Sequence, residues 1–596
     1  MANFSKGYWA DHWTYTVDLI HGWLAIYPDW EERVLFDTTV PYFFSPAHVK
    51  PRAEKYVLST TFDGTGKHVR QLDAVVTDDP DKVAFMEEFV NTATGWYKLK
   101  ANWQHDENGR IFQSSPMAKL FVLATVKFAT RDPFGMGIEY EGGRPGWDDA
   151  NNGLVGMLGS GMPESVELVV LLKLIRSTVS KYAKDLDIPV EAVELMDTIM
   201  EALKNLEAAK PEMPVEKDFM GENDVRVPAP LFEYWDQVST AREMYRAKTK
   251  ITFVGKTKLI TTQEIQAVAT AWIEQIEAGI ELAKKFGTRG HGDTGSFGVP
   301  PTYFSYNVRK WKVNGLETNK GLQLVNATAM EVHVLPMFLE GPARLMKLLG
   351  TKNASDLYQT VRSSPLRDTG LGMYTISASL EGQNFDLGRE MAFAPGWLEN
   401  QSVWLHMSYK FYLELLRHGM FEEFYGEMQE GGLLPFMNAD VYGRSLLECS
   451  SFIASSAFED PAVRGRGFLA RLSGSTAEFL TMWVLMTIGP NPFVLDRIGG
   501  LQFQLVPALP RWLFNTNDDG VTSWMSFKLF GSIDVTYHHH LGDEDLFRIA
   551  PSRYVVGFRD GQTVVAEGPF VHADLADKIR RVVFVATIDV YFDAQE

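Results

Sequence analysis

Two adjacent carboxylates follow a tryptophan in a glycine-rich stretch of the chain. Residues Gly142–Gly161 read GGRPGWDDANNGLVGMLGSG, and the motif within them is Trp147-Asp148-Asp149. A carboxylic acid that is desolvated by an aromatic neighbour can keep its proton near neutral pH, as a general acid must. Glycine lets a ligand approach the main chain closely. The same residue types also build ordinary surface turns, so composition alone leaves both interpretations open.

Two segments combine aromatic rings with groups that could bind a sugar. The first lies at the start of the chain and contains Asp11 and Trp13; the second contains Glu399, Asn400 and His406. A pyranose ring has flat apolar faces and polar edges, so aromatic and carboxylate side chains suit it together. Each residue also has an ordinary structural interpretation, because tryptophans bury large areas and buried acids are usually paired.

A fourth cluster could bind an anion. Arg471 and Ser473 precede an apolar helical pattern at 474–488, and Gly474 and Ser475 are its first residues. The free N–H groups at the start of a helix bind anions, and a planar guanidinium can make two parallel contacts with a phosphate. Three arginines could supply that guanidinium: Arg471, Arg289 and Arg144.

The composition disfavours several classes of function. The net charge of −19 argues against nucleic-acid binding, which needs a positive surface. No run of eighteen apolar residues and no signal-peptide core occur, so we expect no membrane segment and a cytoplasmic protein. The single cysteine, Cys449, is consistent with a reducing compartment. We expect no metal cofactor, and His538, His539 and His540 lack the spaced partners of a metal site.

Helical periodicity dominates the first 490 residues, and strand-like alternation dominates the rest. The pattern predicts the following helices: 8–27, 80–95, 115–130, 163–184, 189–208, 230–247, 262–287, 325–349, 354–361, 402–428 and 474–488. Residues 34–75 are expected to be irregular, and Gly287–Gly298 forms a second glycine-rich loop. After about residue 490, alternating β-branched residues and an Arg-Asp-Gly-Gln turn at 559–562 predict strands and a hairpin.

In their order along the chain, these clusters resemble the inverting phosphorylases of glycoside hydrolase family 94. They resemble more closely the related families 149 and 161, which act on β-1,3-glucans. Trp147-Asp148-Asp149 falls where those enzymes have a Trp-Asn-Asp motif whose aspartate is the general acid. The resemblance therefore implies that Asp149 is the proton donor. It also implies an (α/α)6 helical barrel followed by a small C-terminal all-β domain.

The resemblance extends to the phosphate pocket of that group. Glu399-Asn400 followed by His406 is similar to its Glu-Asn-Gly-Gly segment, which ends in a phosphate-binding histidine. The segment Ser473–Ala477 is similar to its Thr-Gly-Thr-Ala segment. The implied phosphate-binding residues are His406, Arg471, Ser473, Gly474 and Ser475. The implied substrate-binding residues are Asp11, Trp13, Arg144, Trp147, Asp148, Glu399 and Asn400.

Two departures from the family pattern qualify these expectations. Asp148 stands where the family commonly has asparagine, so the choice of Asp149 as the acid depends on the alignment of the motif. The family also has an N-terminal β-sandwich and linker ahead of the Asp11 segment, for which this sequence has no counterpart. We therefore expect a barrel domain at 1–490 that lacks its N-terminal portion, with a helical or linker insertion at 185–230, and a sandwich or jelly-roll domain at 491–596. A second chain or a missing segment would complete the barrel.

The sequence thus predicts inverting phosphorolysis of a β-linked gluco-oligosaccharide, with inorganic phosphate as co-substrate and α-glucose 1-phosphate as product. The expected partners are the oligosaccharide, phosphate and further copies of the chain. Two alternatives stay open. One is an inverting hydrolase that uses Glu399 as its base, and the other is a non-catalytic carbohydrate-binding or partner subunit.

Overall fold

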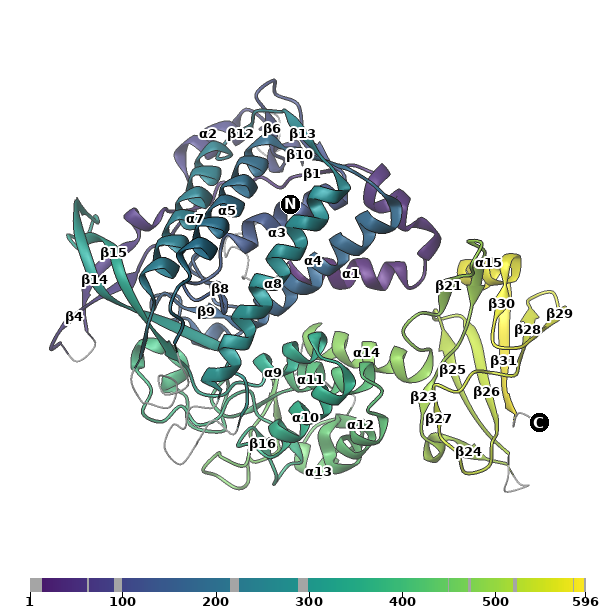
Figure 1. Ribbon diagram of the computed structural model, residues 1–596. Helices are drawn as coiled ribbons and strands as arrows, with labels where there is room; N and C mark the ends of the chain where they lie inside the picture. Colours follow the sequence, from purple (N-terminus) through teal and green to yellow (C-terminus); the bar gives the residue numbers. More distant parts are fainter. Residues whose placement is uncertain are drawn as a thin grey trace.

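The computed structural model describes residues 13–61, 64–90, 99–214, 224–287, 298–446, 448, 450–469, 473–517, 522–582 and 584–593. It is about 41% helical and 24% strand, with many separate small sheets. Figure 1 shows one group of long helices at the top, a second group of shorter helices below it, and a β-rich region at the C-terminal end. The predicted mainly helical (α/α)6 barrel with a small all-β domain is therefore wrong.

The long helices form where helical periodicity predicts them. They are α1 (Thr14–Leu24), α2 (Pro80–Glu87), α3 (Pro116–Phe128), α4 (Met162–Tyr182), α5 (Val190–Ala209), α7 (Ala229–Lys248) and α8 (Thr262–Phe286). Local signals set their starts: Ser115 caps α3 ahead of a proline, and Thr261 and Glu264 form a capping box on α8. Helix α4 packs along α8, and α5 packs along α7. These pairs bury the main apolar core of the upper group.

A long β-hairpin interrupts the helical part of the chain. Strands β14 (Tyr303–Glu317) and β15 (Gln323–Val334) pair antiparallel, so the helix predicted at 325–349 is wrong over residues 325–334. The second part of that range does contain short helical segments, at Glu340–Leu345 and Met346–Leu348. Met330, Val332 and Val334 are buried while the residues between them are half-exposed, which is the alternation of a strand. This hairpin takes chain that a closed barrel would need for further helices, and that is the physical reason why the predicted fold fails.

The hairpin belongs to a seven-stranded sheet that includes both ends of the loop at residues 140–159, called here the acid loop because it contains Asp148 and Asp149. Its order is β4-β3-β15-β14-β9-β8, with β11 (Val225–Arg226) also on β15. The other strands are β3 (Tyr56–Thr60), β4 (Lys67–Gln71), β8 (Ile138–Glu139) and β9 (Ser160–Gly161). Strands β3 and β4 lie in the segment that we expected to be irregular. Since β8 and β9 flank residues 140–159, the sheet holds both ends of that loop.

Small two-stranded sheets tie the irregular connections of the helical groups together. The pairs are β1 (Val40–Pro41) with β7 (Gln113–Ser114), β2 (His48–Val49) with β5 (Val75–Val76), β6 (His105–Asp106) with β12 (Thr252–Phe253), β10 (Leu186–Pro189) with β13 (Thr257–Ile260), and β16 (Arg367–Asp368) with β17 (Met373–Tyr374). A three-stranded sheet contains β18 (Val403–Trp404), β19 (Phe452–Ile453) and β20 (Gly467–Phe468).

The second helical group carries the other candidate site residues. It contains α9 (Glu340–Leu345), α10 (Thr351–Arg362), α11 (Leu405–Arg417), α12 (Phe421–Glu427), α13 (Ala439–Tyr442) and α14 (Ser473–Thr487). Helices α11 and α14 pack side by side. The C-terminal ends of both contact the β-rich region: the Arg548 guanidinium donates to the carbonyls of Leu416 and Arg417, and the Tyr537 hydroxyl donates to that of Thr487. The two helices therefore run in the same direction, with their N-terminal ends together.

The C-terminal region forms strands where alternation predicts them, together with one helix, α15 (Ala573–Arg581). Its six-stranded sheet has the order β24 (Asn515–Thr516), β25 (Ser523–Leu529), β26 (Ile533–His540), β31 (Val585–Asp593), β28 (Arg553–Phe558) and β29 (Thr563–Glu567). Smaller sheets contain β21 (Phe493–Leu495), β22 (Leu501–Phe503) and β30 (Val571–His572), and β23 (Ala508–Leu509) with β27 (Leu546–Phe547). The predicted hairpin is confirmed as β28–β29.

The three consecutive histidines lie on β26 and have separate protein partners. His538 Nε2 is 2.8 Å from Asp589 Oδ1, and His540 Nδ1 is 2.6 Å from Asp593 Oδ1. His539 points to the opposite face, where its Nε2 is 2.7 Å from the Glu544 carbonyl. The three rings therefore do not converge on one point. No helix in the described part of the chain has the length and apolarity to span a bilayer.

Candidate functional site

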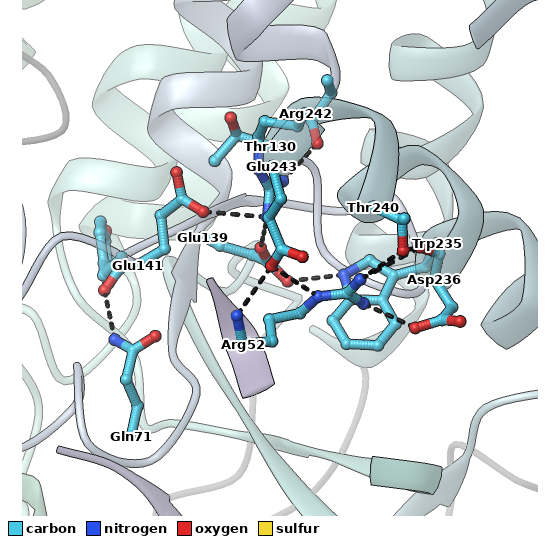
Figure 2. A network of polar contacts seen from close by, with 12 residues as sticks. Arg52, Gln71, Thr130, Glu139, Glu141, Trp235, Asp236, Thr240, Arg242 and Glu243 are labelled. Atoms are coloured by element: carbon cyan, nitrogen blue, oxygen red, sulfur yellow. Dashed lines mark hydrogen bonds and ion pairs between the residues drawn. The ribbon is translucent and has the colours of Figure 1, made fainter. Parts of the chain in front are cut away.

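The strand that leads into the acid loop ends in a buried network of ion pairs. Figure 2 shows Glu139 and Glu141 facing the guanidinium of Arg242. The Trp235 indole donates to Glu139 Oε1 at 2.6 Å, and Arg246 pairs with Glu141. Each of the two carboxylates thus has a cationic partner. The network fixes the chain at the start of the acid loop.

Within the loop, Asp148 and Asp149 have different environments. Asp148 is 1% exposed and caps the short 3-10 helix η5 (Asp149–Asn151). Its Oδ1 accepts from the Ala150 amide at 3.1 Å, and its Oδ2 accepts from the Asn151 side chain at 3.2 Å. Asp149 is half-buried at the start of the same turn. Asp148 therefore shapes the turn, and Asp149 is the more accessible of the two acids.

A second loop packs against η5 backbone to backbone. The Gly153 amide donates to the Leu387 carbonyl at 2.9 Å, and the Arg389 amide donates to Asn152 Oδ1 at 3.0 Å. Gly388 has a φ of 123°, and a Cβ there would lie 2.7 Å from the Gly153 nitrogen. Only glycine fits this approach. It places the next 3-10 helix, η9 (Arg389–Ala392), directly beside the acid turn.

A third loop supplies Glu399 and Asn400. The Gly396 amide donates to the Asn400 carbonyl at 2.8 Å, and the Asn400 side chain donates to the Phe393 carbonyl at 2.9 Å. Leu398 lies in the left-handed region with a φ of 49°, which is costly for a residue with a branched side chain. This tight turn buries both the Glu399 carboxyl and the Asn400 side chain.

The three loops bring several buried carboxyl groups together, and not every one of these groups has an arginine that could neutralise it. Burial raises the pKa of Asp148 well above its usual range, and the charges of Glu399 and Glu340 add to this. Burial also raises the pKa of Glu399; Arg389 opposes the rise and Asp149 adds to it. Glu390, on η9, is fully buried, and burial together with Asp148 and Glu399 raises its pKa well above the usual range. Raised carboxyl pKa values are what acid catalysis near neutral pH requires.

Glu390 is the site residue that sequence reasoning missed. It belongs to no recognised motif, and the sequence around it, Arg389-Glu390-Met391-Ala392-Phe393, offers only an acid within a mostly apolar run. That pattern is also typical of a surface acid at a turn. The tertiary packing of η9 on η5 brings Glu390 to the site.

Trp147 connects the acid loop to His406. Its indole donates to Glu340 Oε2 at 2.6 Å, and its ring lies 4.4 Å from the His406 ring in an edge-to-face arrangement. Burial lowers the pKa of His406 to about 3, and the charges of Lys410 and Arg344 add to this while Glu478 opposes it. The imidazole is therefore neutral at physiological pH, and Lys410 and Arg344 make the potential around it more positive.

The start of α14 lies near His406, as the anion-site hypothesis requires. Lys410 on α11 pairs with Glu478 on α14, which brings the first turns of these parallel helices together. Ser475 is buried, and its hydroxyl has no partner among the described residues. Helix α14 begins at Ser473 and Gly474, whose side chains lie outside the described part, as do Asp11, Arg289 and Arg471.

The positions of Trp13 and Arg144 neither support nor contradict their predicted role in substrate binding. Trp13 precedes α1, is 7% exposed and packs in the main apolar core. Arg144 lies in the acid loop and is half-buried. The contacts found for the described residues do not connect Trp13 with Asp148 or Asp149.

A large cleft opens from His406 toward the C-terminal region. Its volume is about 1380 Å³, and its walls include Tyr15, His406, Lys410, Trp483 and Phe530. Pockets for single small ligands are usually below about 1,000 Å³. The cleft therefore has room for a ligand of several sugar units next to His406.

The described residues contain no group of three His, Cys, Asp or Glu side chains arranged to hold a metal ion. In comparisons with known proteins, no family model matches the chain, and no curated protein matches its sequence.

Proposed function

We propose that the protein catalyses inverting phosphorolysis of a β-linked gluco-oligosaccharide, most simply one of the β-1,3 type. One observation carries the proposal: the acid turn and the His406 end of α11 meet through the contact between Trp147 and His406. A proton donor and a pocket for an anionic nucleophile would thus lie in one place. The lone cysteine supports a cytoplasmic location.

On the acid side, Asp149 would protonate the leaving glycosidic oxygen. Of the two adjacent acids it is the one that a ligand can reach, because both oxygens of Asp148 already accept hydrogen bonds within η5. Asp148 would hold the turn and thereby aim Asp149. Glu399, buried beside Asp149, would bind a sugar hydroxyl.

On the other side, phosphate would attack C1 from the face opposite the leaving group. A phosphate oxygen forms the new bond as the glycosidic C–O bond breaks, which converts the β-linkage to α-glucose 1-phosphate. The proton that leaves Asp149 for the sugar is replaced by the proton of hydrogen phosphate. The neutral His406 imidazole can donate one hydrogen bond to phosphate, and the first N–H groups of α14 supply more.

A hydrolase on the same site would need an ionised carboxylate to activate water. Glu399 is the natural candidate, but burial raises its pKa, which disfavours the ionised form that a base needs. This observation favours phosphate over water as the nucleophile.

Incubation with laminari-oligosaccharides, with and without phosphate, tests the proposal. We expect glucose 1-phosphate only when phosphate is present, with the α-anomer as the first product seen by proton NMR. Free glucose formed at equal rates without phosphate would replace the proposal with hydrolysis. A protein that binds the oligosaccharide and turns over in neither condition would be a binding subunit.

A further inference from the structure

The buried carboxyl of Glu390 has no hydrogen-bond partner in the described chain. The residue is 0% exposed, and both Oε1 and Oε2 lack a donor among the described residues. A buried ionised carboxylate in this state would lose its hydration without compensation, which is very costly. Because no donor among the described residues offsets that cost, the protonated form of Glu390 is the favoured one.

Two residues next to the other acids of the site are also short of donors. The side-chain oxygens of Asn151 and Asn400 are buried, and neither accepts a hydrogen bond from the described residues. Both amides lie beside the carboxyl groups: Asn151 donates to Asp148, and Asn400 follows Glu399 in the chain. An ionised carboxylate only accepts hydrogen bonds, whereas a protonated one also donates. A region with this excess of acceptors is stable only if some of its carboxyl groups keep their protons.

The cations that face this region do not neutralise the negative charge that its carboxyl groups would carry. Asp148 and Asp149 come from η5, Glu399 from the third loop, and Glu340 from α9. Arg389 is the cation that lowers the pKa of Glu399. Another nearby cation, Arg70, pairs with Asp386 at 2.6 Å. Glu340 has donors of its own, because Trp147 and Tyr303 both donate to it. Glu390, Asp148 and Glu399 thus form an acid cluster without matching cations.

We propose that Glu390 is a positioning residue that keeps a shared proton in the cluster of Asp148, Glu390 and Glu399, and so sets the upper pH at which the site still holds its acid. Glu390 is buried behind the acid turn, so it acts through its neighbours and does not touch the substrate. The role in catalysis rests on the proposed function, whereas the shared proton does not. Asp149 would then lie beside carboxyl groups that retain a proton, because repulsion between like charges disfavours its loss.

Glu390→Gln tests the shared proton without substrate. Glutamine has the shape of the protonated acid and cannot ionise. Because the folded-state pKa of Glu390 is raised, its protonated form stabilises the fold below about pH 4.3, and that stability is lost as pH rises toward the folded pKa. The Tm of Glu390→Gln minus that of the wild type should therefore increase by about 1 °C per pH unit between pH 5 and 8.

Glu427→Gln is the matched control, because Glu427 is equally buried but pairs with Arg362 and Arg367 and accepts from Tyr358 and Tyr374. This variant should be less stable than the wild type at pH 7. A Tm difference for Glu390→Gln that is negative at neutral pH, or constant with pH, would overturn the proposal.

Two further measurements keep the proposal testable if Glu390→Gln does not fold. In the wild-type protein, infrared spectra at pH 7 should contain a protonated-carboxyl band that disappears on unfolding; its absence would exclude the shared proton. In the folded variant, the alkaline limb of phosphorolysis should move to lower pH by on the order of one unit, because fewer like charges then hold the proton. An unmoved limb would refute the role in catalysis. If no turnover is found at all, the thermal and infrared results still decide whether the proton is shared.

Discussion

The same segment of chain enters two buried acid clusters that differ in how their charge is compensated. Glu139 and Glu141 face Arg242, and the pKa of Glu141 lies well below its usual range because Arg242, Arg246 and Lys55 outweigh the effect of burial. Burial raises the pKa of Glu139 to about 7, with Arg242 opposing the rise and Glu141 adding to it, so the compensation is complete only at Glu141. A few residues later, Asp148 joins Glu390 and Glu399 without matching cations, and burial raises the pKa values of all three.

This difference in charge compensation indicates which acid cluster is structural and which could take part in chemistry. Glu141, which is buried with Arg242 and Arg246 beside it, is held in its ionised form, so it can anchor the chain but is a poor proton donor. Burial among other acids shifts a carboxyl toward its protonated form at a cost to stability, and such shifts are frequent at functional sites. The Glu139–Glu141 network is therefore the anchor of the acid loop, and the Asp148 region is the candidate site.

The largest expected effect comes from Asp149→Asn. Because the amide cannot give up a proton in place of the acid, kcat for phosphorolysis should fall by about 10²–10⁴-fold while oligosaccharide affinity is retained. Steady-state kinetics and isothermal titration calorimetry measure the two quantities. Lys352→Ala, which removes an exposed ion pair with Asp356, is the control and should keep its activity. Full activity of Asp149→Asn would remove Asp149 from the proposed mechanism.

On the anchor side, Arg242→Met should destabilise the fold by about 3–5 kcal/mol, since it leaves Glu139 and Glu141 buried with less positive charge. Urea unfolding measures the change. Lys528→Ala provides a contrast, because the pair with Asp534 is exposed and worth at most about 1 kcal/mol. Similar losses in the two variants would mean that burial does not distinguish these ion pairs.

A smaller effect is expected for His406→Ala. Loss of one hydrogen bond to phosphate should raise the KM for phosphate by about 10-fold, with the KM for oligosaccharide nearly unchanged. Initial rates over a grid of both substrates separate the two constants. An equal rise in both would indicate that His406 supports Trp147 through their ring contact and does not bind phosphate.

Local patterns predicted the helices well because helical periodicity is a property of neighbouring residues. Helices α3, α4, α5, α7 and α8 begin and end within a few residues of the predicted ranges. Both strands of the hairpin at 303–334 were missed: no strand was predicted at 303–317, and a helix was predicted at 325–349. Barrel closure was inferred from a resemblance of motifs, and motifs say little about the chain between them.

The sequence by itself identified Trp147, Asp149, Glu399 and His406 as groups able to do chemistry, because their types and local motifs carry that information. Only the tertiary structure decided that Trp147 meets His406, that Asp148 is a buried cap while Asp149 is accessible, and that Glu390 joins the acids. Burial and charge compensation determine whether a carboxyl keeps its proton, and both depend on residues that are distant in the chain. The Trp147-Asp148-Asp149 motif is local, but the environment that determines its charge and accessibility is not.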